Sequence, residues 1–438
     1  NWRKYDVFTE SIEAKKSSPT FTFYEGPPSA NGMPGIHHVI ARTIKDLFCR
    51  YKTLKGFQVN RKAGWDTHGL PIELGVEKEL GITKEDIGNS ISIEDYNKAC
   101  RKAVMRYTDV WNDLTQKMGY WVNMDDPYIT YSPKYMESVW WLLKQIYNQD
   151  LIYKGYTIQP YSPKAGTGLS SHELNQPGTY QEVTDTTVVS QFEAIEESLP
   201  NKLKNNGPIH LLAWTTTPWT LPSNTALTVG SKIEYVLIKT FNQYTFKPIN
   251  VILAKALVQE QFTGKYTQVG SELSLQEFRS DAKKIPYYIS NSFLGKNLVD
   301  IKYKQLLCYA LPNEHPEHAF RVIDGDFVTT EDGTGIVHTA PTFGAEDAIV
   351  AKKAIPEIPP MLIEDESGNL VPLVDFQGRF RKEVTDFAGQ YVKNEYYSDS
   401  DQVPERSVDV EIAIKLKEEK PTFLLSKRLK VLIKEIRV

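Results

Sequence analysis

The sequence predicts an α/β protein that combines part of a doubly wound parallel sheet with an inserted, mainly β, barrel-like region. Near the start, a short β-prone run is followed by a Gly-Pro turn and a helix-compatible run. After about residue 180, many short β-prone runs alternate with turn-forming segments. We therefore expect the parallel-sheet region in 1–180, the β insertion in 181–395, and a return segment with a divergent tail in 396–438.

The first strand is expected at Phe21–Tyr24, a β-prone run that fits a buried strand. It ends at Gly26-Pro27-Pro28, where helix is disfavoured. A helix is expected from about 38 to 54, with apolar residues at helical spacing: Ile40, Ile44, Leu47 and Tyr51. In this arrangement ligands bind at the carboxyl ends of strands, and phosphates bind at helix N-termini.

Two polar motifs lie where this arrangement would place a ligand. Adjacent imidazoles at His37 and His38 stand at the expected helix start, where they can donate hydrogen bonds to a polyphosphate, or can be ordinary surface histidines. The stretch Gly64–Pro71 supplies a carboxylate, Asp66, that can hold an ammonium group. Together the two motifs predict a nucleotide site with an ammonium subsite beside it.

Two long helices are expected next. Ser92 with Asp95 can cap the first, Gly119 can end it, and its stripe is Tyr96, Cys100, Tyr107, Trp111, Leu114 and Met118. The second begins at Ser132-Pro133, and its predicted buried stripe is Met136, Val139, Trp140, Leu143 and Tyr147. Aromatic stripes at this spacing favour core packing over a cofactor site.

The expected β insertion carries two polar constellations. The first is the run Thr215-Thr216-Thr217, followed by Pro-Trp-Thr and then Asn224; three threonines alone can be mere strand formers. The second is Gly333–Pro341, with His338 inside it and Asp347 nine residues further on. A carboxylate facing the threonines could bind an ammonium group. The structural alternative makes His338 a core histidine and Asp347 a first-turn residue of a helix starting near Ala345.

Composition is that of an ordinary globular protein, with 41% hydrophobic and 24% charged residues over 438 positions. The net charge of −4 means that contact with a nucleic acid requires local basic patches. We expect no membrane association, because no apolar run reaches spanning length and no signal peptide opens the chain. Cys49, Cys100 and Cys308 lie far apart, so neither a disulfide framework nor a protein-bound metal is expected, and the default setting is cytoplasmic.

The motifs resemble those of class I aminoacyl-tRNA synthetases and, within that class, the isoleucyl enzymes. Residues 26–38 look like the signature loop that ends in His-x-Gly-His, and 64–73 look like the amino-acid-pocket motif G-W-D-x-H-G-L-P-I-E. The threonine run resembles the editing motif of isoleucyl, valyl and leucyl enzymes. The resemblance covers roughly the first 400 residues, and implies the first half of a Rossmann-like catalytic domain with an inserted editing domain.

The resemblance implies a role for each matching residue. Asp66 should bind the substrate's α-ammonium, Gly26 and Pro27 should shape the side-chain pocket, and His68 belongs to the same substrate-binding motif. The nucleotide-binding set consists of Pro28, Asn31, Gly35, His37 and His38. The implied cofactor is ATP, used as a substrate together with Mg²⁺.

The signature loop departs from the family pattern. Where the family has His-x-Gly-His, this chain reads Gly35-Ile36-His37-His38, so the first His and the Gly have exchanged places. Gly35 offers no imidazole, while His38 keeps its position. Our hypothesis is that His37 serves the phosphates from the neighbouring position.

For the insertion, the resemblance implies hydrolysis of a wrongly charged tRNA. Thr215, Thr216 and Thr217 would position a water molecule, Asp347 would hold the amino group of the attached amino acid, and no metal would be required. His338 would help to exclude isoleucine. Asn224 is placed with the substrate-binding residues.

The implied activity is ATP-dependent attachment of isoleucine to tRNA-Ile, with hydrolysis of mischarged Val-tRNA-Ile, by a monomer whose partners are tRNA-Ile, isoleucine and ATP. The run 425–430 echoes the K-M-S-K-S loop only superficially, and we assign it to a basic, solvated terminal segment or to a truncated or shifted reading frame. We expect a longer parent protein and poor aminoacylation by this chain alone. The alternatives are a freestanding trans-editing hydrolase and a non-catalytic tRNA-binding fragment.

Overall fold

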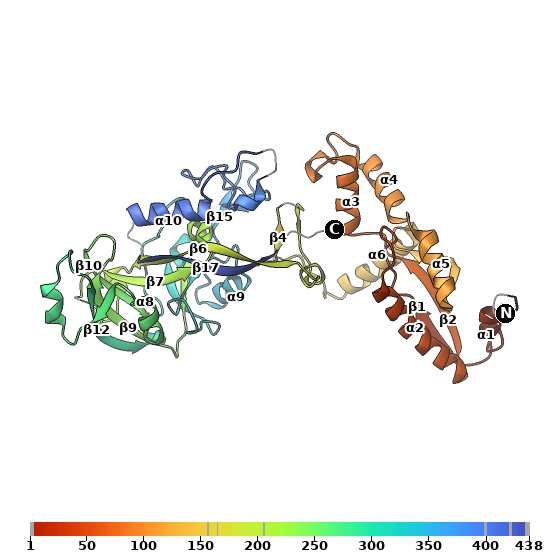
Figure 1. Cartoon of the computed structure of the whole chain (residues 1–438), viewed down its shortest axis with the longest axis horizontal. Helices are drawn as coiled ribbons and strands as arrows, with labels where there is room; N and C mark the ends of the chain where they lie inside the picture. Colours follow the sequence, from red (N-terminus) through yellow and green to blue (C-terminus); the bar gives the residue numbers. More distant parts are fainter. Residues whose placement is uncertain are drawn as a thin grey trace. The chain divides into compact units, whose positions relative to one another are not determined.

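The structure, a computed structural model, falls into two compact units that divide at Gly155 (Figure 1). We call them unit 1 and unit 2. The residues that the structure describes are 4–155, 157–163, 165–204, 206–397, 401–419 and 423–433. The functional boundaries expected at 180 and 395 stay predictions.

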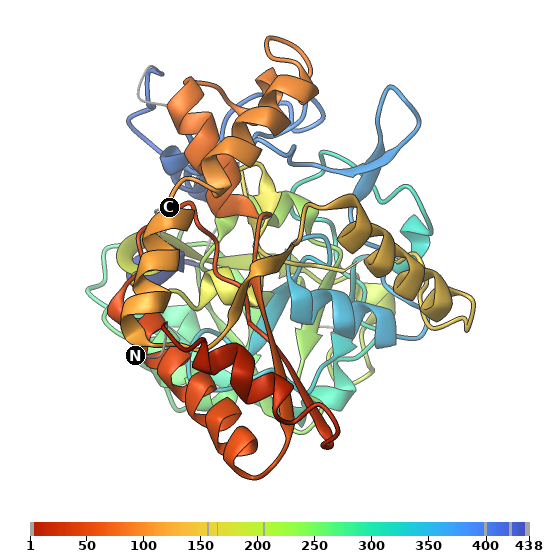
Figure 2. The same ribbon diagram turned by 90° about the vertical axis from the view of Figure 1, so that its right-hand side faces the viewer.

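Unit 1 is built on a three-stranded parallel sheet in the order β1-β2-β3 (Figures 1 and 2). Its strands are β1 (Thr20–Tyr24), β2 (Gln58–Trp65) and β3 (Asn123–Ile129). Helix α2 (Ile36–Leu54) connects β1 to β2, as a parallel pair requires. The predicted order of strand, turn and helix is therefore confirmed. However, β1 is an edge strand with exposed and half-buried side chains, so the prediction of a buried strand was wrong.

The remaining helices of unit 1 correct one boundary. Ser92 and Ser132 cap helices through their side chains, and Gly119 (φ 67°) ends one, as predicted. The predicted single helix over 92–118 is two helices, because Tyr107 N donates to Ala30 O and leaves the helical ladder. The helices are α1 (Val7–Glu13), α3 (Leu70–Leu80), η1 (Lys84–Asp86), α4 (Ile93–Val104), α5 (Thr108–Met118) and α6 (Pro133–Tyr147).

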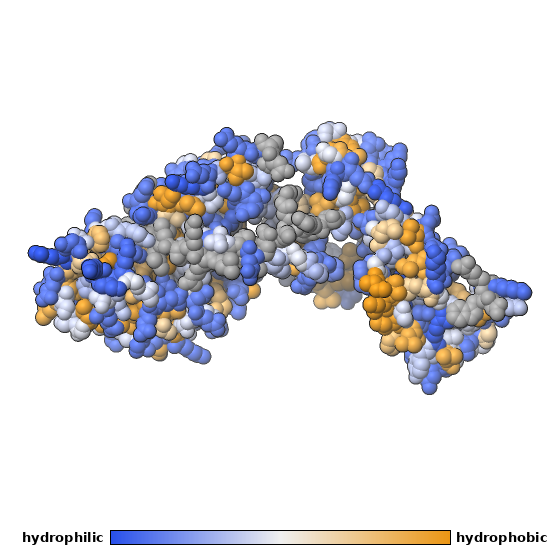
Figure 3. Space-filling view, viewed as in Figure 1, coloured by the Kyte–Doolittle hydropathy of each residue, from blue (hydrophilic) through white to orange (hydrophobic). Residues whose placement is uncertain are grey.

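The apolar stripe predicted to be buried on α6 is instead exposed. Trp140 is 64% exposed, Tyr147 63% and Leu143 47%. Hydrophobic residues also gather on the face of unit 1 that carries α2, where Ile40 and Leu47 are more than half exposed (Figure 3). Helical spacing identifies which face of a helix is apolar, but it does not supply an element to cover that face.

Unit 2 is mainly β, as predicted. Its main sheet has the strand order β11-β12-β9-β10-β7-β14-β8-β13, with β6 paired to β7. These strands are β6 (Tyr180–Glu193), β7 (Ile209–Thr215), β8 (Ala226–Val229), β9 (Glu234–Phe241), β10 (Pro248–Ala254), β11 (Tyr266–Gln268), β12 (Ile285–Leu294), β13 (Arg321–Asp324) and β14 (Ile336–Thr339). Two small hairpins are β4 (Tyr161–Ser162) with β5 (Thr167–Gly168), and β15 (Leu362–Glu364) with β16 (Leu370–Pro372).

Helices of unit 2 pack around this sheet. The hydrophobic core of unit 2 is fully buried. Leu211, Leu227 and Leu237 on three central strands have no exposed surface. The α-helices are α7 (Ser171–Leu174), α8 (Val258–Gln261), α9 (Ala345–Lys353) and α10 (Val408–Glu419). The short 3₁₀ helices are η2 (Glu196–Ser198), η3 (Pro218–Ser223), η4 (Lys255–Leu257), η5 (Glu272–Glu277), η6 (Gly295–Asn297), η7 (Pro316–His318) and η8 (Asn394–Tyr396).

The segment predicted to be a solvated tail is a strand. β17 (Leu424–Ile433) pairs antiparallel with β6, in the register Leu424↔Val189 to Ile433↔Tyr180 (Figure 1). The basic residues of this segment are interleaved with leucine, valine and isoleucine, which favour a strand. Among the described residues, no helix has both the length and the hydrophobicity needed to cross a bilayer.

Candidate functional site

One cavity in unit 2, of about 720 Å³, brings the two predicted constellations together. Thr215, Thr216 and Thr217 line it from the end of β7, His338 lines it from β14, and Asp347 lines it from α9. The strands β7 and β14 pair in parallel through Trp214 and Val337, which is why motifs more than a hundred residues apart meet. A volume of this size is typical of small-ligand sites.

The threonine run forms a hydrogen-bonded turn between β7 and η3. Thr217 N donates to Thr215 Oγ1 at 3.1 Å, and Thr220 Oγ1 donates to Thr217 O at 2.8 Å. Thr215 is buried, whereas Thr216 and Thr217 are half-buried against the cavity. The run is therefore a fixed turn that presents polar groups to a ligand, in addition to completing a strand.

Two glycines allow the second motif to approach the first. Gly333 and Gly335 have φ values of 73° and 71°, which disfavour any side chain. A Cβ on Gly333 would lie 2.8 Å from the ring of Trp214, and one on Gly335 would lie 2.4 Å from Ala254 Cβ. Close packing of β14 against its neighbours thus depends on glycine at both positions.

His338 is held by a buried amide. Asn224 donates through Nδ2 to Ala226 O and to His338 Nδ1, both at 2.8 Å. It accepts from the Tyr303 hydroxyl through Oδ1 at 2.7 Å. Asn224 therefore lies behind His338 and fixes its orientation, and it is not among the residues that line the cavity.

These contacts determine the tautomer of His338. Because Nδ1 accepts from Asn224, the ring proton lies on Nε2, which donates to Thr220 Oγ1 at 3.1 Å. Burial lowers the pKa of His338 to about 4, so the ring is neutral at physiological pH. Both ring nitrogens are occupied, and His338 is thus at once a hydrogen-bonded core histidine and part of the cavity wall.

Asp347 lies in the first turn of α9, and the helix begins at Ala345, as predicted. Its Oδ2 accepts from Ala340 N at 2.8 Å, and burial raises the pKa of its carboxyl group. A Cβ on Gly344 would lie 2.5 Å from the same oxygen, so the carboxylate occupies space that only glycine leaves open. A half-buried carboxylate at a cavity wall is well placed to bind a cationic group.

Sequence reasoning missed the residues that complete the cavity. Trp219 and Phe343 both line it and pack edge to face, with ring centroids 4.9 Å apart. Trp219 N donates to Asp409 Oδ1 at 2.8 Å, and this carboxylate is fully buried beside Lys393. No pattern at Asp409 or Tyr303 pointed to the site, because their link to it is a contact between distant segments.

In unit 1, the signature loop and the amino-acid-pocket motif lie side by side. The strands β1 and β2 pair in parallel, and Asp66 N donates to Pro28 O at 3.0 Å just beyond their ends. Trp111 Nε1 donates to Gly32 O at 2.9 Å, and Ala30 beside it is fully buried. The loop is therefore anchored at its middle.

The remaining predicted side chains of unit 1 are more open. Asp66 and His68 are exposed, and His68 Nδ1 lies 3.2 Å from Thr130 Oγ1. Gly26 is exposed, and Pro27 is half-buried. Asn31 Oδ1 accepts from Ser29 Oγ at 2.8 Å.

The exchanged His and Gly of the loop occupy one small space. Gly35 N donates to His38 Nδ1 at 2.9 Å, which leaves His38 Nε2 to carry a proton. The rings of His37 and His38 lie 3.8 Å apart, and burial lowers the pKa of His38. A Cβ on Gly35 would lie 2.8 Å from His37 Cε1. The ring of His37 thus occupies the space in which a side chain at position 35 would begin.

The class of this protein is given by its match to a known family. The family model for class I tRNA synthetases (I, L, M and V) matches residues 1–408, and the chain belongs to that family. Within it, the chain is 59% identical over 435 residues to an isoleucine--tRNA ligase of Cytophaga hutchinsonii. It is 54% identical over 445 residues to one of Bacteroides fragilis. Each alignment covers 97% of this chain and 38% of the relative, so the chain spans little more than a third of their length.

Solved structures align more weakly. A leucyl-tRNA synthetase editing domain of P. knowlesi covers 37% of this chain and 60% of its own, with 13% identity and a TM-score of 0.27. A LeuRS–tRNA complex of Agrobacterium radiobacter covers 98% of this chain and 47% of its own, with 14% identity and a TM-score of 0.31.

Proposed function

We propose that this chain is part of an isoleucyl-tRNA synthetase and that unit 2 hydrolyses mischarged Val-tRNA-Ile. The observation that carries the proposal is the single cavity lined by the threonine turn, His338 and Asp347. The names of the similar relatives support the choice of isoleucine. The proposed partners of the whole protein are tRNA-Ile, isoleucine and ATP, and its proposed setting is a monomer in the cytoplasm.

A hydrolytic site supplies discrimination between amino acids that binding alone cannot provide. One methylene in an apolar pocket changes the binding free energy by only about 1–3 kcal/mol, which limits discrimination between isoleucine and valine. The isoleucyl enzyme is the usual example of this limit, and the figure comes from that general case. A second cavity that admits valine and excludes isoleucine adds the missing discrimination. The fixed ring of His338 and the aromatic pair Trp219–Phe343 are rigid wall elements suited to excluding a larger side chain.

The proposed reaction is attack of water on the ester that joins valine to the 3′ ribose of the tRNA. The bond between the acyl carbon and the ribose oxygen breaks, which releases valine and leaves a hydroxyl on the tRNA. Asp347 holds the ammonium group. The turn at Thr215–Thr217, which the bond from Thr217 N to Thr215 Oγ1 holds in place, orients the water with its backbone and hydroxyls. His338 does not serve as the base, because both of its nitrogens are engaged and its pKa is about 4.

Unit 1 is proposed to take part in forming isoleucyl-adenylate. ATP with Mg²⁺ would supply the activated phosphate, and the residues that fit it are the imidazoles of His37 and His38 at the start of α2. Asp66 would hold the ammonium group of isoleucine. Support for His37 replacing the missing imidazole is that its ring fills the space beside Gly35.

The exchange in the signature loop has its own test. In a full-length protein, the double change Gly35→His with His37→Gly should alter the affinity for an adenylate-like inhibitor, measured by calorimetry. Each single change serves as a control for the order of the two residues. Equal inhibitor binding in the wild type and the double variant would remove the role proposed for His37.

The hydrolytic activity is tested by deacylation of Val-tRNA-Ile with the 438-residue chain. We expect release of valine without ATP, much slower release of isoleucine from Ile-tRNA-Ile, and loss of valine release in Thr216→Ala. Equal rates on both substrates would contradict an isoleucine-excluding cavity. If the full-length protein hydrolyses Val-tRNA-Ile but does not bind ATP, a freestanding trans-editing hydrolase would be favoured. If the protein binds tRNA but does not hydrolyse the ester, a non-catalytic fragment would be favoured.

A further inference from the structure

The wall of the cavity in unit 2 includes the start of η3, where the local sequence leaves one backbone amide without a partner. Pro218 has no amide hydrogen, and the side chain of Thr217 does not cap the helix. The first N–H of η3 is therefore that of Trp219, and it donates to Asp409 Oδ1 at 2.8 Å. Asp409 lies on α10, 190 residues further along the chain. A distant carboxylate thus supplies the cap that η3 lacks locally.

This capping carboxylate is buried, and a lysine holds its second oxygen. Asp409 has no exposed surface, and its Oδ2 accepts from Lys393 Nζ. Lys393 also donates to Asp185 Oδ2 on β6 at 2.6 Å, and its own side chain is 13% exposed. A buried charge is tolerated only when it is paired and hydrogen-bonded. Lys393 therefore fixes both the charge and the orientation of Asp409.

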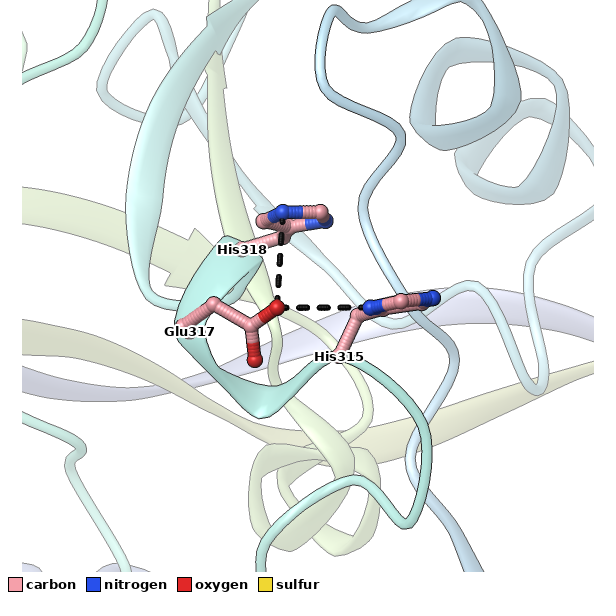
Figure 4. A group of neighbouring side chains, drawn as sticks. All are labelled: His315, Glu317 and His318. Carbon is pink, nitrogen blue, oxygen red and sulfur yellow. Dashed lines mark hydrogen bonds and ion pairs between the residues drawn. The ribbon is translucent and has the colours of Figure 1, made fainter.

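The pair of Asp409 with Lys393 differs from the exposed contacts of unit 2. His315 Nδ1 lies 3.3 Å from Glu317 Oε1, for example, with both side chains more than 60% exposed (Figure 4). Such a surface contact contributes little, because water screens it. At Asp409 the loss of one partner would leave a buried polar group unpaired, which is costly. The buried pair is therefore able to hold the start of η3 in one position.

The start of η3 positions two parts of the cavity wall. The ring of Trp219 packs on that of Phe343, and both rings line the cavity. Thr220, the next residue of η3, accepts from His338 Nε2 at 3.1 Å. A displacement of the Trp219 amide would therefore move the aromatic pair and the hydrogen-bond partner of His338 together.

We propose that Asp409 is a positioning residue of the hydrolytic cavity, and that by fixing Trp219 it sets the size of the side chain that the cavity admits. Lys393 acts through Asp409 as its counterion. Asp409 itself does not line the cavity. The proposal rests on the proposed hydrolysis of Val-tRNA-Ile and deepens it. A purely structural ion pair would affect the stability of unit 2 but not the choice between valine and isoleucine.

The test compares Asp409→Asn and Asp409→Ala in the 438-residue chain, by steady-state deacylation of Val-tRNA-Ile and Ile-tRNA-Ile. Asparagine offers one acceptor oxygen where the carboxylate offers two, and alanine offers none. In Asp409→Ala we expect kcat/KM for release of isoleucine to rise about tenfold, mainly through a lower KM, because exclusion of one methylene by a rigid wall provides at least that factor. The rise should be smaller in Asp409→Asn, and release of valine should change much less in both variants.

The matched control is Arg321→Met, which breaks an ion pair between a buried guanidinium and Asp300 at a position that does not line the cavity. This variant should lower the stability of unit 2 and leave the discrimination unchanged. A second readout is the exchange of the Trp219 amide hydrogen, followed by NMR with isotope-labelled tryptophan. Exchange should be faster in Asp409→Asn, which keeps the size of the side chain, and should stay at the wild-type rate in Arg321→Met.

The outcomes separate this proposal from the proposed function. Failure of the wild type to release valine would refute the hydrolytic function itself. Release of valine with the same discrimination in the wild type and both Asp409 variants would overturn the role of Asp409, and so would an equal loss of discrimination in Arg321→Met. Unchanged exchange of the Trp219 amide in Asp409→Asn and Asp409→Ala would contradict the cap.

Discussion

The two units present their candidate sites in opposite ways. In unit 2, the buried side chains of Asn224 and Tyr303 lock the cavity wall through hydrogen bonds. In unit 1, the backbone of the motif loops is anchored, but Asp66 and His68 are exposed, and α6 presents an uncovered apolar face. The comparison teaches that within this chain the unit 2 site is already preorganised, whereas the unit 1 site has its scaffold but not an enclosed pocket.

The largest expected effect tests the carboxylate of the preorganised site. Asp347→Asn removes a charged partner of the ammonium group, worth about 1.5–3 kcal/mol, so deacylation of Val-tRNA-Ile should fall about 100-fold. The matched control is Glu346→Gln, because Glu346 is exposed and lines a different hollow on the other side of α9. Single-turnover deacylation rates would measure both, and an equal loss in the two variants would point to general damage of α9.

The second prediction concerns the buried relay behind His338, by which we mean the hydrogen bonds from Tyr303 to Asn224 and from Asn224 to His338. Tyr303→Phe leaves Asn224 Oδ1 without its donor in a fully buried position, which should cost about 1–3 kcal/mol of stability in unit 2. Freed Asn224 also lets the His338 ring turn, so discrimination between Val- and Ile-tRNA should weaken. Unfolding by urea and deacylation of both substrates would measure the two effects. Unchanged stability and discrimination would show that the relay is dispensable.

The third prediction uses the pH dependence of the same histidine. The ordinary pKa of 6.5 falls to about 4 in the folded protein, so between these values the unfolded chain binds more protons than the folded one. Stability of unit 2 should therefore decrease as pH falls, by about 1–2 kcal/mol from His338 between about pH 6.5 and pH 5. His338→Gln should remove that part of the slope. Urea-dependent proteolysis of unit 2 at each pH would measure it.

The smallest expected effect tests the space around Asp347. In Gly344→Ala, the new Cβ would meet Asp347 Oδ2 at 2.5 Å, so the carboxylate must move away from Ala340 N. Deacylation should fall about tenfold, because small displacements of positioning groups are costly. Gly270→Ala is the control, since a Cβ there meets nothing within 4 Å. A normal rate in Gly344→Ala would mean that the observed Asp347 rotamer is not the active one.

The strands and motifs that the sequence predicted correctly are those with strong local signals. The β-prone runs of unit 2, the cap at Ser92 and the helix start at Ala345 each follow from a few neighbouring residues. The meeting of the threonine turn with Asp347 in one cavity was expected from resemblance, and the pairing of β7 with β14 now provides its physical basis.

The wrong predictions share one cause. The hydrophobic periodicity of a segment indicates its local conformation and its apolar face, but it does not identify the segment that packs or pairs with it. The stripe on α6 was read as core although no described element covers Trp140, and β17 was read as solvated although β6 pairs with it. Tyr303 and Asp409 were missed for the same reason. Each acts on the site through a single long-range contact that leaves no pattern near it in the chain.

The most direct test of the account is calorimetric binding of a hydrolysis-resistant valyl-adenosine analogue to the 438-residue chain. We expect one molecule to bind in unit 2, with affinity at least about tenfold weaker in Asp347→Asn and unchanged in Asp66→Asn. Binding that is insensitive to Asp347→Asn, or that is lost in Asp66→Asn, would contradict the claim that the cavity of unit 2 recognises the aminoacylated end of the tRNA.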